Sequence, residues 1–116
     1  MNPLEGIVRF NEDRKLKTFN GAAEYSMLLE ELQEFYSAVA EENEHETVDA
    51  LCDIIVVAVG TIHKLGYAPE DALRETVEEI TSRKGSFNEA VGKWQKDESQ
   101  NPSTLYKADY SAARRF

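Results

Sequence analysis

The stretch "ETVDALCDIIVVAVGTIHKLG", residues 46–66, decides the fold, because apolar residues fill it without the alternation that a strand would show. We expect a helix over residues 46–65, with Gly66 as its C-terminal stop. Asp49 and Asp53 lie within this apolar run. Negative charge in such surroundings is costly unless a partner compensates for it, so the two aspartates are candidates for a site.

A second long helix is expected before this one, over residues 22–42. Its apolar residues recur at spacings of three and four, which is typical of an amphipathic helix; they are Tyr25, Leu28, Leu29, Leu32, Phe35, Tyr36 and Val39. Inside it, "LLEELQEF" carries Glu30, Glu31 and Glu34. The connector "EENEHET" is short and polar, which favours two antiparallel neighbouring helices.

The remaining chain predicts two further helices and an arm. Pro3 and the apolar residues that follow it indicate a short first helix that ends before "KLKTFNG". Pro69 opens a helix that runs to about Arg83, with acidic residues in its first turn. The helical spacing of apolar residues fades after "RKGSF", and in no segment do apolar and polar residues alternate as they would in a strand. We therefore predict an all-α bundle of about four helices over residues 1–87 and an irregular C-terminal arm over residues 88–116.

The carboxylates of the two long helices fall into two stripes. Glu30 and Glu31 lie four and three residues before Glu34, and Glu46, Asp49 and Asp53 are spaced by three and four, so each set shares a helix face. In an antiparallel pair the two stripes can face each other and would repel strongly. A divalent cation is the usual relief, and oxygen-only ligands favour Mg²⁺, with Mn²⁺ as the alternative.

Each piece also has an ordinary structural explanation. A solvated helix face accounts for Glu30, Glu31 and Glu34 taken alone, and Glu46 at a helix start can be a partner of the helix dipole. Asp49 can lie at a helix edge. Asp53 is different, because six apolar residues follow it directly. Its environment makes a solvated carboxylate the weaker explanation, and both stripes together favour a metal site.

Three other candidates carry less weight. Glu42-x-x-His45 has the spacing of a di-iron half-site, but no second copy of that motif occurs, so we reject such a centre. Cys52 is expected to be a small buried hydrophobe, not a nucleophile. A basic group, Arg83, Lys84 and Lys93, either complements a helix C-terminus or contacts phosphates.

Composition narrows the function further. The 116 residues carry a formal net charge of −9, which disfavours binding to a nucleic-acid polymer. The single cysteine excludes a disulfide framework within one chain, and neither a signal peptide nor a membrane-spanning run is present in this sequence, so we expect a cytoplasmic protein. Residues 50–59 are apolar nearly all round the helix, and a chain this small cannot cover them, so we expect a homo-oligomer, either a dimer or a tetramer.

The two acidic stripes carry a resemblance to a known superfamily. E-E-x-x-E in "LLEELQEF", followed by "ETVDALCDIIVVAVGTIHKLG", resembles the all-α nucleoside triphosphate pyrophosphohydrolases, which include MazG-like proteins, phosphoribosyl-ATP pyrophosphohydrolases and dimeric dUTPases. The sequence is most similar to small MazG-like proteins over about forty residues. The common second motif of the superfamily is E-x-x-D, but Ala50 stands three residues before Asp53, so either Asp49 substitutes or Glu46-x-x-Asp49 is the motif.

The resemblance implies Mg²⁺-dependent hydrolysis of a nucleoside triphosphate to a monophosphate and pyrophosphate by a metal-activated water. It implies Glu31, Glu34 and Asp53 as metal ligands and Glu30 as the residue that orients or deprotonates the water. Two alternatives stay open: hydrolysis of phosphoribosyl-ATP by the same chemistry, and a non-catalytic helical adaptor with solvated acidic stripes.

Overall fold

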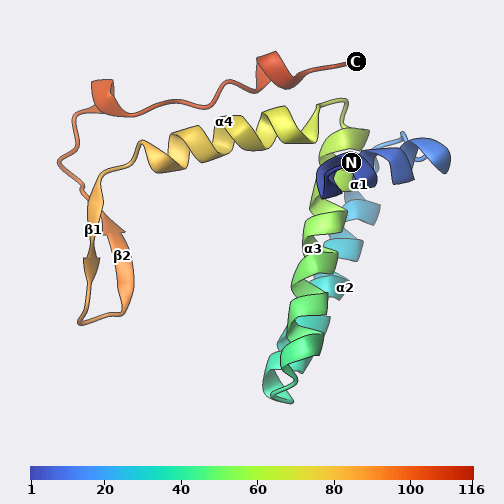
Figure 1. Ribbon diagram of the computed structural model, residues 1–116, viewed down its shortest axis with the longest axis horizontal. Coiled ribbons are helices and arrows are strands. Elements are labelled where there is room, and N and C mark those ends of the chain that lie inside the picture. Colours follow the sequence, from blue (N-terminus) through green and yellow to red (C-terminus); the bar gives the residue numbers. More distant parts are fainter. The chain divides into compact units, whose positions relative to one another are not determined.

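The computed structural model describes residues 1–116 as two units, Met1–Pro69 with Arg115–Phe116 and Glu70–Arg114. Its four helices are α1 (Pro3–Asp13), α2 (Gly21–Ala40), α3 (Glu44–Lys64) and α4 (Pro69–Thr81) (Figure 1). The all-α class is therefore confirmed, and the observed helix ends lie within about two residues of the predicted ones. The predicted domain boundary after residue 87 stays a prediction. No helix combines the length and the apolar character needed to cross a membrane.

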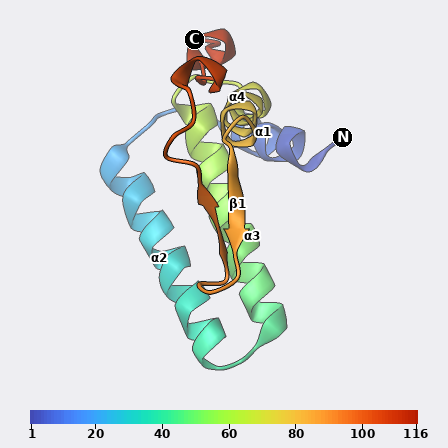
Figure 2. The ribbon, with the colours of Figure 1, turned by 90° about the vertical axis from the view of Figure 1, so that its left-hand side faces the viewer.

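α2 and α3 form an antiparallel hairpin (Figure 2). Each helix begins at an asparagine whose side-chain oxygen accepts a hydrogen bond from a first-turn amide, Asn20 from Ala23 and Asn43 from Glu46, both at 3.1 Å. Such a cap satisfies one of the free N–H groups of a helix start. Glu42 turns the chain between the helices with a positive φ of 54°. The short connection fixes which residues of the two helices face each other.

Small residues are buried between the two helices of this hairpin. Ala38 of α2 and Ala50 of α3 are buried, and Val59 is buried nearer the end of α3. Alanine at facing positions lets the two backbones approach closely. As a result the carboxylates that flank these alanines are brought together across the hairpin.

A buried ion pair joins α2 and α3 beyond the alanines. Lys64 Nζ lies 2.6 Å from Glu24 Oε1, and the Thr61 hydroxyl donates to Glu24 Oε2 at 2.7 Å. The side chains of Lys64 and Glu24 are only 14% and 6% exposed. Both oxygens of this carboxylate are therefore engaged, and the contact ties the start of α2 to the end of α3.

α1 packs against α3 through an amide. Asn11 is 3% exposed, and its Nδ2 atom donates to the carbonyl oxygen of Gly60 at 3.1 Å. Gly60 is itself buried, so this hydrogen bond lies inside the contact between the two helices. A buried polar side chain thus fixes where α1 lies on α3.

The outer faces of α2 and α3 remain apolar and exposed. Exposed large apolar side chains at heptad-like spacing on α2 are Tyr25, Leu29, Leu32, Tyr36 and Val39, and those on α3 are Val48, Leu51, Ile55 and Val56. Cys52 lies among the latter and is exposed, so the prediction of a buried cysteine was wrong for the single chain. Its apolar neighbours Leu51, Ile55 and Val56 are exposed as well.

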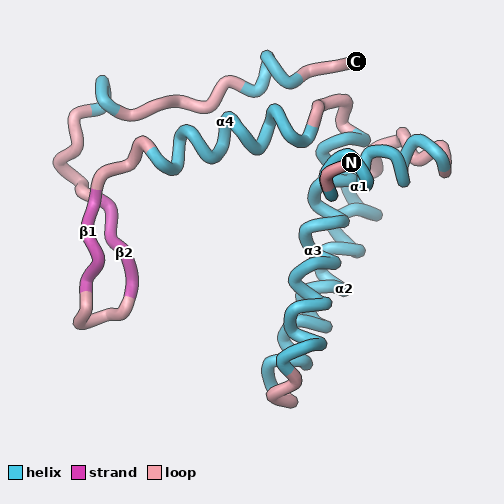
Figure 3. The backbone as a smooth tube through the Cα atoms, in the orientation of Figure 1, coloured by secondary structure: helices cyan, strands magenta, loops and turns pink.

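The second unit adds a small sheet to α4. Strands β1 (Gly85–Asn88) and β2 (Lys93–Lys96) pair antiparallel, with Phe87 opposite Trp94 (Figure 3). The expectation that no segment would form a strand was wrong here. Each strand has only four residues and is largely exposed, so neither shows an alternating pattern of burial. Two 3-10 turns, Pro102–Thr104 and Tyr110–Ala113, follow the sheet.

The segment after the sheet runs along α4 and is held by two glutamates. Glu75 Oε1 accepts a hydrogen bond from the Tyr106 hydroxyl at 2.5 Å and from the Asp109 amide at 2.9 Å. One turn further, Glu79 Oε1 accepts from the Ala108 amide at 2.9 Å. The arm therefore has a defined course, set by side chains four residues apart on α4.

These contacts predict an alkaline transition in the second unit. The hydrogen bond to Glu75 raises the pKa of Tyr106 to about 12, with desolvation and the charge of Glu75 adding to it. Because the folded pKa exceeds the unfolded value of 10.0, this contribution to stability is present below pH 10 and is lost as the pH rises towards 12. We expect Tyr106→Phe to remove the last tyrosine step in an absorbance titration. A wild-type titration in which all tyrosines ionise together near pH 10 would contradict this.

Candidate metal centre

Three carboxylates from α2 and α3 converge at the centre of the hairpin. Glu31, Glu34 and Asp53 each place a carboxylate oxygen so that all three atoms lie within 4.8 Å of one another. Glu31 and Glu34 lie one turn apart on α2, and Asp53 faces them from α3 because the hairpin is antiparallel. Glu31 and Asp53 are half-buried and Glu34 is exposed, so the cluster is open on one side.

The electrostatics of this cluster are unfavourable for the protein alone. Desolvation raises the pKa of Glu31, and the hydrogen bond and charge of Glu34 and the charges of Asp53 and Glu30 raise it further. Its Oε2 atom is buried and has no hydrogen-bond partner. An unpartnered buried oxygen among like charges fits a divalent cation, because such a cation is coordinated by oxygen and removes the repulsion.

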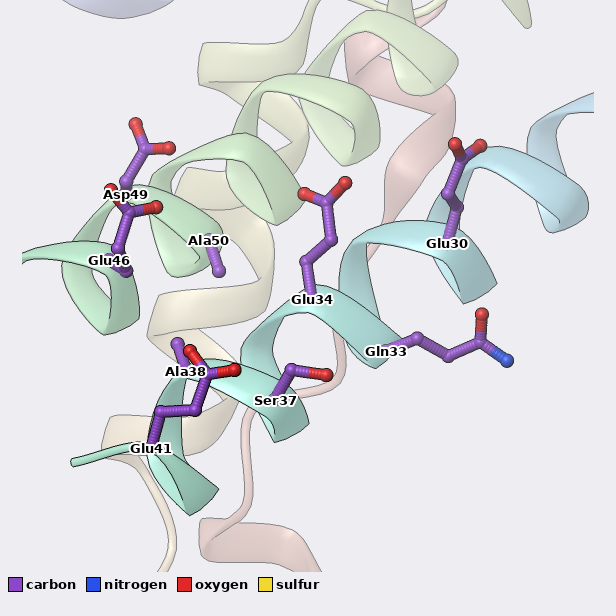
Figure 4. Close-up of a pocket in the computed structure, with 9 residues that line it drawn as sticks. All are labelled: Glu30, Gln33, Glu34, Ser37, Ala38, Glu41, Glu46, Asp49 and Ala50. Carbon is purple, nitrogen blue, oxygen red and sulfur yellow. The ribbon is translucent and has the colours of Figure 1, made fainter. Parts of the chain in front are cut away.

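An acidic groove continues from this triad along the hairpin. It has a volume of about 340 Å³, and its polar lining includes Glu30, Gln33, Glu34, Ser37, Glu41, Glu46 and Asp49. Figure 4 shows Glu30, Glu34 and Glu41 projecting from α2, and Glu46 and Asp49 projecting from α3. Glu34 belongs both to the triad and to this lining. The groove therefore leads from solvent to the converging carboxylates.

The structure separates the candidate residues of the second motif. Asp53 joins the triad, whereas Glu46 and Asp49 line the groove. Glu46 and Asp53 are only about 20° apart around the helix axis, but they are about 10 Å apart along it. One small ion cannot contact two carboxylates at that spacing, so the shared helix face does not make a shared site. Asp49 lies between them, one turn from Asp53.

The three basic candidates all lie in the second unit. Arg83 is 3.5 Å from Glu79 Oε2, and the Lys84 amide donates to Gln100 Oε1 at 2.8 Å. Arg83 lines a cavity of about 410 Å³ with Lys96 and Lys107. Lys93 pairs with Asn88 at the turn end of the sheet, three residues before Lys96. The lysines that line a cavity with Arg83 are therefore Lys96 and Lys107, and not Lys84 and Lys93 as the sequence predicted.

Two residues that could have a function, Asn11 and His63, were not predicted to meet by any pattern in the sequence. Asn11 and His63 are hydrogen-bonded at 3.2 Å although they are separated by 52 residues. His63, in the last turn of α3, is half-buried, while His45 near the start of the same helix is exposed. For the Glu24–Lys64 pair a weak signal existed, because Glu24 precedes Glu31 by seven residues and so shares its helix face.

Comparison with known proteins adds one positive finding. The family model described as phosphoribosyl-ATP pyrophosphohydrolase matches residues 12–80, which is more than half of the chain. The match contains α2 and α3 in full, and with them the triad and the groove. No curated protein and no solved structure matches.

Proposed function

The chain belongs to the phosphoribosyl-ATP pyrophosphohydrolase family, a part of the MazG-like superfamily of pyrophosphohydrolases, and we propose that it cleaves the α–β phosphoanhydride bond of a nucleotide. The family makes the protein a hydrolase of acid anhydrides and sets the helical adaptor aside. The proposed substrate is a ribo- or deoxyribonucleoside triphosphate, and the proposed products are the monophosphate and pyrophosphate. Mg²⁺ is the proposed cofactor, with Mn²⁺ as the alternative.

One observation carries this proposal: Glu31, Glu34 and Asp53 converge, and a buried oxygen of Glu31 lacks a hydrogen-bond partner. These three residues would hold the divalent cation. When bound, the cation supplies positive charge for the phosphate oxygens and lowers the pKa of water. The acidic chain could not bind a triphosphate without that charge, because the groove beside the triad is lined with further carboxylates.

The other groove residues have proposed roles in the same reaction. Glu30 is exposed and lines the groove together with Glu34, which supports its proposed role of taking the proton of the attacking water. The water oxygen forms a new bond to phosphorus as the bridging P–O bond breaks, and pyrophosphate leaves. Glu46 and Asp49 would attract further cations that accompany the substrate. Phosphate binding by Arg83, Lys84 and Lys93 is proposed from their charge alone.

A second candidate substrate has its own support. The family takes its name from the hydrolysis of phosphoribosyl-ATP. This reaction breaks the same α–β bond, and its substrate differs from ATP only in a phosphoribosyl group on the base. The triad would bind both substrates in the same way, because they share the phosphate chain that its cation contacts. The distinction therefore depends on residues that contact the base.

The proposal is tested with a panel of substrates and an isotope. Ribo- and deoxyribonucleoside triphosphates and phosphoribosyl-ATP are each incubated with Mg²⁺ in ¹⁸O-water, and the products are identified by mass spectrometry. We expect a monophosphate and pyrophosphate, with one ¹⁸O atom in one of them. Orthophosphate with a nucleoside diphosphate, or a phosphorylated protein, would contradict the proposed reaction.

Assembly into a homo-oligomer belongs to the same proposal. The exposed apolar stripes on α2 and α3 are suited to pack against a second copy of the hairpin, which would form a four-helix bundle. Ile55, at 55% exposed, belongs to the α3 stripe and lies near the middle of the helix. Both dimer and tetramer are consistent with this surface.

We expect light scattering to give a multiple of 13.1 kDa at micromolar concentration. Ile55→Lys should shift the mass towards that of the single chain, because a charge on an apolar interface is costly to bury. His45→Lys, at an exposed position outside the stripe, serves as the control and should leave the mass unchanged. A wild-type protein that is monomeric under these conditions would refute the assembly.

A further inference from the structure

A second cavity of the first unit lies away from the carboxylates. It has a volume of about 260 Å³ and is lined by Asn11, Glu12, Leu16, Lys17, His63 and Phe116. The C-terminal end of α1, the loop after it and the last turn of α3 contribute five of these residues, and Phe116 is the sixth. Nothing in the proposed metal site uses this cavity, although it contains a buried amide and an imidazole.

The hydrogen bonds of Asn11 fix the orientation of its amide. The carbonyl oxygen of Gly60 can only accept, so the atom of Asn11 that lies 3.1 Å from it must be the nitrogen. The same nitrogen lies 3.2 Å from His63 Nδ1. Because both hydrogens of the amide are then engaged, the Oδ1 atom is left as an acceptor.

This arrangement also selects the tautomer of His63. Its Nδ1 atom faces an N–H donor and must accept, so the proton of the neutral ring resides on Nε2. The ring of Phe116 stands at 89° to the imidazole, with the ring centres 6.3 Å apart, and Phe116 is 65% exposed. The cavity thus presents a fixed N–H donor, an amide acceptor and an exposed aromatic ring.

We infer that this cavity binds the nucleobase of the substrate, with His63 as a residue that determines base specificity and Asn11 as the residue that positions it. A planar heterocycle can stack on Phe116 and offer a ring nitrogen or carbonyl oxygen to His63 Nε2–H. His63 follows Asp53 by ten residues, which is about 15 Å along α3. That separation suits a nucleotide whose phosphates lie at the triad. The inference rests on the proposed nucleotide substrate.

The test compares base preference in matched variants. His63→Leu should raise KM for the preferred nucleotide at least tenfold, change kcat less, and reduce the differences between bases. His63→Gln should recover part of the preference, because its amide can still donate. His45→Leu, on the exposed start of the same helix, is the control and should match the wild type. A folded His63→Leu protein with wild-type KM values for all bases would overturn the inference.

A spectroscopic measurement separates failure of the inference from failure of the proposed function. In ¹⁵N-labelled wild-type protein, the side-chain spectrum of His63 should show the Nε2–H tautomer, and adding a free nucleoside of the preferred base should shift its Nε2 signal. If no nucleotide is hydrolysed but a nucleoside shifts this signal, the proposed reaction fails and the pocket stands. If nucleotides are hydrolysed and no nucleoside or nucleotide shifts it, the pocket assignment fails alone.

Discussion

Asp53→Asn is expected to lower kcat/KM for the hydrolysed nucleotide by about a thousandfold or more, which corresponds to about 4 kcal/mol of lost transition-state stabilisation. Asp53 is the only member of the triad contributed by α3, and the substitution removes its charge while keeping its size. The Mg²⁺-induced rise in melting temperature should fall in parallel, since a weaker ligand set stabilises the folded state less.

The matched variant is Asp49→Asn, one turn earlier on the same helix and outside the triad. We expect this substitution to lower kcat/KM by about tenfold, because Asp49 acts through the electrostatic field of the groove and not as a ligand of the central ion. If Asp49→Asn and Asp53→Asn have equal effects on activity and Mg²⁺ binding, the metal centre lies further along the groove than the triad. Near-normal activity of Asp53→Asn would refute the triad as the metal site.

The second large effect concerns stability. Glu24→Leu should lower the free energy of unfolding by about 3–5 kcal/mol, because it leaves the half-buried Lys64 ammonium without its partner. For a chain of this size the loss corresponds to a melting temperature lower by on the order of 10–20 °C. Lys64→Met should be similarly harmful, since it strands the carboxylate of Glu24 in the same place.

The double variant, Glu24→Leu with Lys64→Met, provides the control. It removes both charges and replaces them with apolar side chains, so we expect it to recover much of the lost stability. Thermal unfolding of the four proteins gives the coupling energy of the pair directly. If the single losses are small and simply add in the double variant, the ion pair contributes little to holding α2 against α3.

The helices could be predicted because their signals are local. The spacing of three and four residues and the stop at Gly66 place α2 and α3 within about two residues, and the apolar run around Asp53 makes it a candidate site residue. Sequence spacing could show that Glu46 and Asp53 share a face, but not which of them meets Glu31. That depends on how the two helices align, which is set by the turn at Glu42 and by the small residues between the helices.

The features that were missed depend on distant or absent partners. The contact of Asn11 with His63 joins residues 52 positions apart, and no local pattern encodes it. The hairpin at residues 85–96 is short and exposed, so it lacks the alternating burial by which strands are found. Cys52 was expected to be buried because its neighbours are apolar, but those neighbours face outward in a single chain. An apolar sequence pattern indicates that a helix face is suited to burial, but it does not identify the surface that packs against it.

The contact between Gly66 and the C-terminal residues determines which part of the first unit forms last during synthesis. Gly66 has a φ of +96°, and its carbonyl oxygen accepts from the amide of Arg115 at 2.7 Å. An added Cβ there would lie 2.5 Å from the carbonyl oxygen of Phe116, so the returning backbone needs glycine at this position. The first unit is therefore discontinuous in the chain, with the whole of residues 70–114 inserted into it. On the ribosome, the α2–α3 hairpin can form early, whereas the cavity beside His63 acquires its last wall only after Phe116 has emerged.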